Sequence, residues 1–158
     1  MSRTLIIGLG NPILRDDAVG LHVARRVQDA LPSAAGIEVV QECVGGLRLM
    51  ERMVGYDRAL LIDARRSGRP PGTVQLLDPL DMTTQHSASS HDVNLATALA
   101  VGRRSGARLP ADDQIRIVAV EVEDVETFSE TMSPAVEAAV PAAADRVLRV
   151  IETEWEAA

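Results

Sequence analysis

The feature that most constrains this chain is an alternation between short apolar runs and segments of helical period. Residues 4–8 form a five-residue apolar run closed by a glycine, which is typical of a strand buried in a parallel sheet. Residues 16–31 then place valines at every fourth position, as on one face of a helix. Pro32 is expected to end that helix. Such alternation favours helices packed against a parallel sheet.

The same alternation continues to the end of the chain. Further strands are expected at residues 37–42, 59–63, 73–77 and 115–120, and helices at 46–54, 91–104 and from 133 towards 154. Gln75 interrupts the fourth apolar run, which indicates a place near an edge of the sheet. Ser133 and Pro134 fit an N-cap and first helical position, and Pro141 is expected to break or kink that last helix. The predicted fold is α/β: three layers, with a mostly parallel twisted sheet of about five strands and helices on both faces.

Length and composition set the class of protein. A chain of 158 residues is the size of one domain, so we expect residues 1–158 to form a single domain. The chain has 16 basic and 23 acidic side chains, which gives a net charge of −7. Neither nucleic acid nor an anionic membrane surface is therefore an expected partner. One cysteine excludes an internal disulfide framework. With no signal peptide or membrane span in view, we expect a cytoplasmic monomer.

Three polar residues stand where a doubly wound sheet places its ligand site, beyond the carboxyl ends of the strands. Asp17 is the second residue of an acidic pair after the first strand, Asp63 ends an otherwise apolar strand, and His91 opens a helix after a long polar loop. For Asp16 and Asp17 the simpler interpretation is capping of the following helix. Two carboxylates and an imidazole converging at one sheet edge nevertheless suit a borderline divalent metal such as nickel or zinc.

The first loop begins like a dinucleotide-binding fingerprint but does not complete it. Gly8 and Gly10 stand at the first two glycine positions, whereas Ile13 occupies the third. The acidic pair that follows would also repel a pyrophosphate. The glycines therefore predict a tight strand-to-helix turn, and no organic cofactor is expected.

This opening loop, from Gly8 to Gly20, resembles the signature of the [NiFe]-hydrogenase maturation proteases: Gly-Asn, a few residues, an acidic pair, then a glycine. The resemblance extends in order along nearly the whole chain. Asp63 in Leu-Ile-Asp-Ala matches the family's aspartate at a strand end, and His91 in Ser-Ser-His-Asp matches its histidine before a helix. The Ser-Pro-Ala-Val sequence that begins at Ser133 resembles the start of the family's last helix.

The resemblance implies an endopeptidase that removes the C-terminal tail of the nickel-loaded [NiFe]-hydrogenase large-subunit precursor. It implies that Asp17, Asp63 and His91 are both the metal ligands and the catalytic residues, and that the nickel arrives with the substrate. One segment departs from the family pattern. Many members carry Asp and then Gly-Thr after the second strand, where this chain has Gln41-Glu42-Cys43-Val44. Because that segment helps to choose the substrate, the hydrogenase served is left open.

Mechanism and function each leave alternatives. A metal would polarise the scissile carbonyl or activate water, whereas a carboxylate alone would serve as general base. A non-catalytic nickel-binding maturation chaperone would use the same ligands without cleaving a partner. A peptidyl-tRNA hydrolase also opens with Gly-Leu-Gly-Asn-Pro, but it continues with His-Asn and presents a basic RNA-binding face, neither of which this acidic chain offers.

Overall fold

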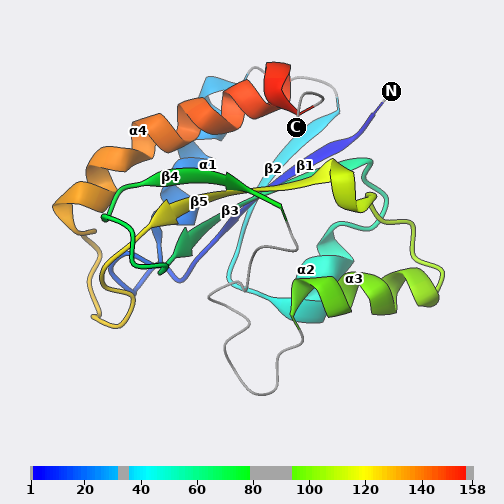
Figure 1. Cartoon of the computed structure of the whole chain (residues 1–158), viewed down its shortest axis with the longest axis horizontal. Helices are drawn as coiled ribbons and strands as arrows, with labels where there is room; N and C mark the ends of the chain where they lie inside the picture. Colours follow the sequence, from blue (N-terminus) through cyan, green and yellow to red (C-terminus); the bar gives the residue numbers. More distant parts are fainter. Residues whose placement is uncertain (1, 32–35, 79–93, 156–158) are drawn as a thin grey trace.

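A five-stranded sheet lies between two layers of helices (Figure 1). The computed structural model describes residues 2–31, 36–78 and 94–155. The strands are β1 (Thr4–Leu9), β2 (Ile37–Glu42), β3 (Arg58–Arg65), β4 (Val74–Leu77) and β5 (Ile115–Glu121). The helices are α1 (Val19–Ala30), α2 (Gly46–Arg52), α3 (Leu95–Arg104), the short η3 (Asp112–Gln114), α4 (Pro134–Arg149) and its π-helical continuation η4 (Val150–Glu154). The predicted α/β three-layer fold is confirmed.

The strand order is β2-β1-β3-β5-β4, with β1 and β3 in the interior of the sheet. The pairs β1–β2, β1–β3 and β3–β5 are parallel, and only β4 runs antiparallel, against β5. The prediction that the strand with Gln75 lies at an edge is confirmed. There the Arg65 guanidinium donates a 3.0 Å hydrogen bond to the Gln75 side chain, so the polar interruption is satisfied within the fold.

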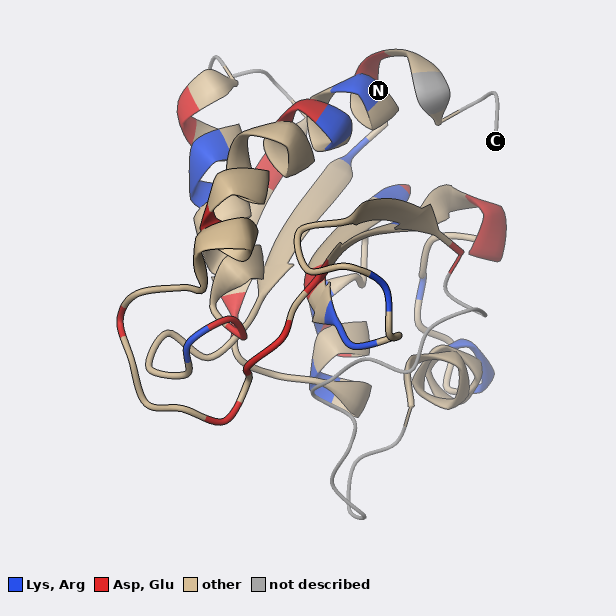
Figure 2. Ribbon diagram, turned by 60° about the vertical axis from the view of Figure 1, so that its left-hand side comes forward, with Lys and Arg blue, Asp and Glu red and all other residues tan. Residues whose placement is uncertain are grey.

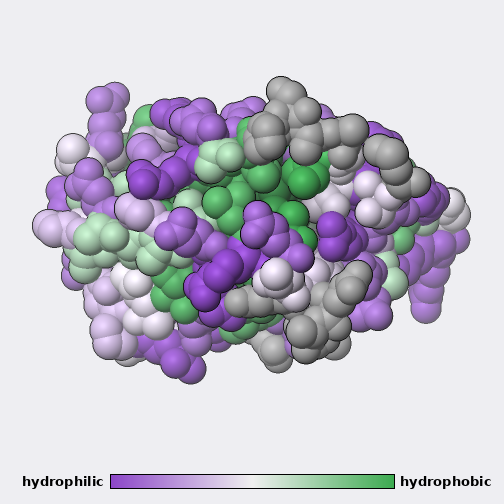
Figure 3. All heavy atoms as spheres, turned by 90° about the horizontal axis from the view of Figure 1, so that it is seen from above, coloured by the Kyte–Doolittle hydropathy of each residue, from purple (hydrophilic) through white to green (hydrophobic). Residues whose placement is uncertain are grey.

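Two apolar cores hold the layers together, one on each face of the sheet. In β3, Leu60 and Ile62 join the core beneath α1 and α4, while Ala59 and Leu61 join the core beneath α2 and α3. A strand buried on both faces reads as one continuous apolar run, which is why this segment shows no alternation in sequence. Figure 3, seen from above the α4 side, shows apolar side chains gathered in the middle of a face ringed by polar ones.

Two local expectations differ from the structure. Of the two outcomes expected at Pro141, a break or a kink, the break does not occur, since α4 runs through this residue without interruption. Pro141 lies on the exposed face of α4, where water can satisfy the carbonyl that loses its partner. The third strand also continues past Asp63 to Arg65, since it keeps pairing with β5 after its ladder with β1 has ended. Within the described residues, no helix is long and apolar enough to cross a membrane.

Three glycines let α1 approach the sheet closely. A Cβ on Gly8 would lie 2.4 Å from the Gly20 carbonyl oxygen, and one on Gly10 would lie 2.3 Å from the Asp17 carbonyl oxygen. A Cβ on Gly20 would lie 2.2 Å from the oxygen of Leu9 and 2.5 Å from that of Ile62. None of the three has a positive φ. These positions therefore need glycine for lack of a side chain, and not for the turn conformation that the sequence predicted.

Replacing Gly20 by alanine should destabilise the fold by about 3 kcal/mol, the upper part of the usual range for overpacking, because the new methyl group meets backbone atoms that cannot move aside. Gly102→Ala in α3 is the matched control. Its Cβ would meet the flexible Met50 and Leu109 side chains, and alanine favours the helix by up to about 1 kcal/mol. Urea unfolding of both variants checks the difference. Equal stability losses would show that close approach of α1 is not what Gly20 provides.

Candidate active site

The two predicted aspartates lie at the point where the strand order reverses. The chain passes from β1 through α1 to β2 on one side, and β3 pairs on the other side of β1, so the gap between β1 and β3 is the switch point where such folds bind ligands. Gly20, in the first turn of α1, touches the carbonyls of Leu9 and Ile62. Asp17 precedes that turn and Asp63 follows Ile62 in the strand. Both carboxyl-bearing residues therefore belong to the same edge of the sheet.

Each of these aspartates is buried and oriented by a backbone donor. Asp17 is 5% exposed, and its Oδ2 accepts a 2.8 Å hydrogen bond from the Asn11 backbone N–H. Asp63 is 0% exposed, and its Oδ1 accepts a 2.8 Å bond from the Ala64 backbone N–H. The Asn11 side chain in turn accepts from the Ile13 N–H, which shapes the loop. The carboxylates are thus held in place by the chain that carries them.

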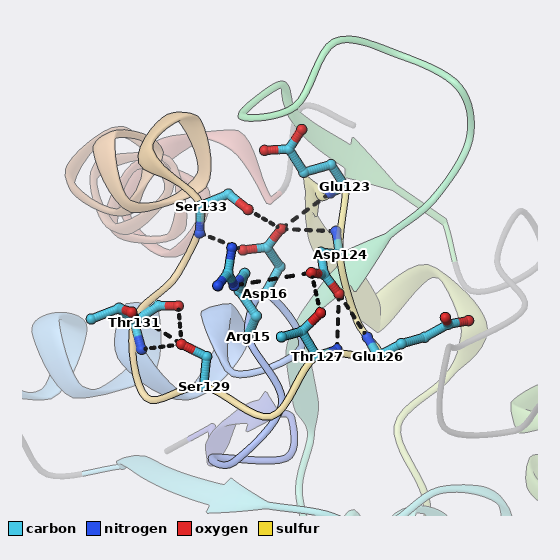
Figure 4. A network of polar contacts seen from close by, with 9 residues as sticks. All are labelled: Arg15, Asp16, Glu123, Asp124, Glu126, Thr127, Ser129, Thr131 and Ser133. Atoms are coloured by element: carbon cyan, nitrogen blue, oxygen red, sulfur yellow. Dashed lines mark hydrogen bonds and ion pairs between the residues drawn. The ribbon is translucent and has the colours of Figure 1, made fainter.

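Asp16, the other member of the acidic pair, has a structural role. It is 0% exposed, and its carboxylate accepts hydrogen bonds from the backbone N–H groups of Glu123, Asp124 and Ser133 and from the Ser133 hydroxyl, at 2.7–3.2 Å (Figure 4). The capping interpretation of the pair is therefore wrong: α1 begins at Val19, its N-cap is Ala18, and no side chain caps it. Asp16 joins the loop after β1 to the loop after β5.

Ser133 occupies the predicted N-cap position of α4, with Pro134 at the first helical position. Its hydroxyl makes no capping bond to the helix, because it donates to the Asp16 carboxylate instead. The Ser133 hydroxyl, which was expected near the start of α4 for local reasons, thus contacts a residue far away in the chain. That contact fixes the start of α4 beside the loop that carries Asp17.

The loop between β5 and α4 is itself ordered by hydrogen bonds. The Asp124 carboxylate accepts from the backbone N–H groups of Glu126 and Thr127 and from the Thr127 hydroxyl. These bonds lower the pKa of Asp124 to about 2, with a smaller effect of Arg15. Backbone bonds from Arg15 to Thr127 and from Ser129 to Ile13 join the two loops as a short paired segment. Hydrogen bonds therefore hold the loops around Asp17 in a fixed conformation.

A hollow of about 380 Å³ lies between the loop after β1, helix α1 and the end of β2. Asp17 is not part of its lining, but Gly10, which is, lies against the backbone of Asp17. Its lining comes from the loop after β1, from α1 and from the end of β2: Gly10, Pro12, Leu21, His22, Arg25, Gln41, Glu42 and Cys43. Burial and then Arg25 lower the pKa of His22, and the Glu42 carboxylate forms an ion pair with Arg52. The segment in which this chain departs from the family pattern thus forms one wall of a hollow that shares Gly10 with the loop leading to Asp17.

His91 lies outside the described residues, as does the start of the helix predicted at 91–104. In the part that is described, α3 begins after Asn94, whose side chain accepts from the Thr97 N–H. Among the described residues alone, no three His, Cys, Asp or Glu side chains are grouped to hold a metal. The structure thus brings Asp17 and Asp63 to one edge of the sheet, and the complete set with His91 stays a prediction.

Comparisons with known proteins agree with this geometry. The sequence profile of the hydrogenase maturation proteases matches residues 21–150. The chain belongs to this family. The hydrogenase 2 maturation protease of Escherichia coli is 26% identical over 152 residues, covering 94% of this chain and 90% of the relative. The hydrogenase expression/formation protein HupD of Rhizobium leguminosarum is 22% identical, covering 96% and 75%.

Solved structures give the same assignment. The hydrogenase maturating endopeptidase HybD from E. coli has a TM-score of 0.79 and 26% identity over 95% of this chain and 92% of that one. The maturation protease HycI from Thermococcus kodakarensis shares the fold, with a TM-score of 0.70 and 20% identity over 96% and 94%. The chain is thus an endopeptidase of hydrogenase maturation that processes the C-terminus of a hydrogenase large subunit. This assignment decides against the peptidyl-tRNA hydrolase alternative.

The residues that brace the site of this maturation protease were not predicted from its sequence. Asp16 was visible only as half of an acidic pair, and its four donors lie more than 100 positions away. Asp124 followed by Thr127 was a usable signal, since aspartate often accepts from N–H groups two and three residues further on.

Asp16→Asn should destabilise the protease by about 2–3 kcal/mol, because whichever way the amide turns, at least one buried backbone N–H faces an NH₂ group. Ser133→Ala removes one hydroxyl donor and leaves three N–H donors on the carboxylate, so it should cost about 1 kcal/mol. Urea unfolding followed by circular dichroism measures both. An Asp16→Asn variant as stable as Ser133→Ala would refute the bracing role of the charge.

The stability of the protease should fall between about pH 4 and pH 2 in part through Asp124. Its pKa is about 2 in the folded chain and about 3.9 when unfolded, so the contribution is complete above pH 4 and disappears as pH falls towards 2. An NMR titration of the side-chain carboxyl measures the folded pKa. Asp124→Asn should flatten the acid side of the stability profile, and titration of Asp124 near pH 4 would contradict this account.

Proposed function

We propose that Asp17, Asp63 and His91 carry out the processing step and bind nickel that the large-subunit precursor brings with it. The observation that supports this most is the burial of two backbone-oriented carboxylates at the switch point of the sheet. Carboxylate oxygens with an imidazole suit a borderline divalent ion. The donor set of this chain therefore fits the metal of the substrate.

In this proposal the protein positions the two carboxylates, and the substrate's metal anchors the scissile bond at the site. Asn11 and Ala64 fix one oxygen each of Asp17 and Asp63, so both carboxylates are oriented before the substrate arrives. The metal supplies Lewis-acid polarisation of the scissile carbonyl or of a water molecule. Three protein ligands leave coordination positions for groups of the precursor. A carboxylate acting alone as general base is the competing mechanism, and it uses the same two aspartates.

The hollow that Gly10 lines suits a role in holding the part of the substrate that lies near the scissile bond. It is lined by Gly10, whose backbone lies against that of Asp17, and by Gln41 and Cys43 at the end of β2. A volume of about 380 Å³ is of the size that holds small ligands or a few side chains. We propose that this wall contributes to the choice of hydrogenase.

Asp63→Asn should reduce processing by about 100-fold or more, because it removes one of the two charges at the site. The fold should be retained, since the new carbonyl oxygen can still accept from the Ala64 N–H. The assay follows the shortening of a nickel-loaded large-subunit precursor by gel and mass spectrometry, with thermal unfolding as the check on folding.

Asp145→Asn is the matched control, because Asp145 is exposed on α4, away from the carboxyl edge of the sheet. It should process the precursor at the wild-type rate. Unimpaired processing by Asp63→Asn would remove Asp63 from the mechanism. Tight nickel binding without any shortening by the wild type would favour the chaperone alternative.

A further inference from the structure

Phe128 is placed unlike the other aromatic residues of this chain. Tyr56 and Trp155 lie at the amino end of the sheet, where Arg3 and Arg58 stack on their rings at 4.6 Å. Phe128, the only phenylalanine, lies on the loop between β5 and α4 and is 77% exposed. Exposed aromatic side chains are uncommon on free surfaces and enriched at the centres of protein interfaces. This position therefore needs an explanation that packing within the chain does not give.

The exposure of Phe128 is imposed by a well-braced backbone. Phe128 forms an isolated antiparallel bridge with Leu14, flanked by hydrogen bonds from Arg15 to Thr127 and from Ser129 to Ile13. Asp124 and Ser129 order the two sides of the loop, and Asp16 holds its ends (Figure 4). Ile13, on the partner segment, is also 52% exposed. The loop thus presents apolar side chains to solvent at a fixed position relative to Asp17.

The same loop is strongly acidic. Glu123, Glu126 and Glu130 are all exposed, and acidic residues recur along this loop in Figure 2. Within the described part of the chain, the side chains of these three glutamates form no hydrogen bond or ion pair. An aromatic residue between unpaired charges of one sign suits a partner with an apolar hollow and a basic rim.

We propose that Phe128 is the anchor of a docking surface for the folded body of the hydrogenase large-subunit precursor, with Ile13 beside it and Glu123, Glu126 and Glu130 as its charged rim. This inference rests on the proposed function, since it names the part of the substrate that the protease holds apart from the scissile tail. A partner seated on Phe128 is set in register with Asp17, because Leu14 and Asp16 tie the two segments together. Docking here places the tail at the catalytic edge.

A second copy of this chain is a less suitable occupant. A two-fold contact through Phe128 would bring the acidic rim of one copy against the same rim of the other, and the chain carries a net charge of −7. Like charges brought together at an interface oppose association. The precursor is favoured because the loop that carries Phe128 is tied to the segment of Asp17, and the precursor is the partner whose tail must reach that segment.

The experiment measures kcat and KM for processing of the nickel-loaded precursor. Phe128→Ser should raise KM about tenfold or more and leave kcat within twofold, because the residue binds substrate and does not touch the reacting atoms. Phe128→Leu should recover much of the loss. Val101→Ser on α3 is the matched control, since Val101 is 44% exposed and α3 packs on the other face of the sheet. A Glu123→Gln, Glu126→Gln, Glu130→Gln triple variant should weaken the rise of KM with added salt.

Each other outcome overturns the proposal. An unchanged KM for Phe128→Ser in a correctly folded variant removes the docking role, and a loss of kcat alone assigns the loop to the catalytic step. Self-association of the wild type that Phe128→Ser abolishes, seen by analytical ultracentrifugation, assigns the surface to a second copy. Absence of processing by the wild type would instead refute the proposed function itself, so the two failures are distinguishable.

Discussion

The Asp16 carboxylate is the interaction on which the architecture of the site depends. Four donors from residues 123, 124 and 133 converge on it in a position that water does not reach. A buried carboxylate is tolerated when hydrogen bonds replace its hydration, and here these bonds join the loops that follow β1 and β5. The neighbouring Asp17 is thereby placed at the switch point with a defined orientation. In one acidic pair, the first residue builds the site and the second is the one that we propose for chemistry.

The two ends of the sheet differ in role: contacts at the amino end hold the fold together, and the candidate site lies at the carboxyl end. At the amino end, stacked pairs such as Arg58 on Trp155 and hydrogen bonds such as that from Tyr56 to Glu38 close the fold. At the carboxyl end, buried aspartates, an acidic loop and the exposed Phe128 gather around the switch point. Parallel strands direct all their carboxyl ends to one side, so an α/β fold concentrates loops for function there. The membership of the chain in the hydrogenase maturation proteases agrees with this arrangement.

Sequence predicted the layers of this fold because hydrophobic period is a local property. Burial of a strand or helix shows in a few neighbouring residues. Examples are the apolar run of β3, the valines of α1 and the interruption at Gln75. The role of Asp16 was mistaken because its partners are distant in the chain, and local capping rules then offered the wrong explanation. Ser133 was placed correctly as the N-cap of α4, but its hydroxyl donates to the distant Asp16 carboxylate, which no local rule predicts. Gly20 was found as part of a motif, yet its reason, close approach to Leu9 and Ile62, exists only in three dimensions. Asp17 and Asp63 were predicted to lie close together because the carboxyl ends of parallel strands, and the loops that follow them, share one edge of the sheet.

We propose that the two aspartates act on a metal carried by the substrate. Processing of three precursor samples tests it most directly: nickel-loaded, metal-free with chelator, and metal-free mixed with protease that was first exposed to nickel. This account predicts that only the nickel-loaded precursor is shortened, since a metal already held by the substrate is what fixes the scissile bond at the site. Efficient shortening of the metal-free precursor in the presence of chelator would contradict it and would favour a mechanism that uses the carboxylates alone.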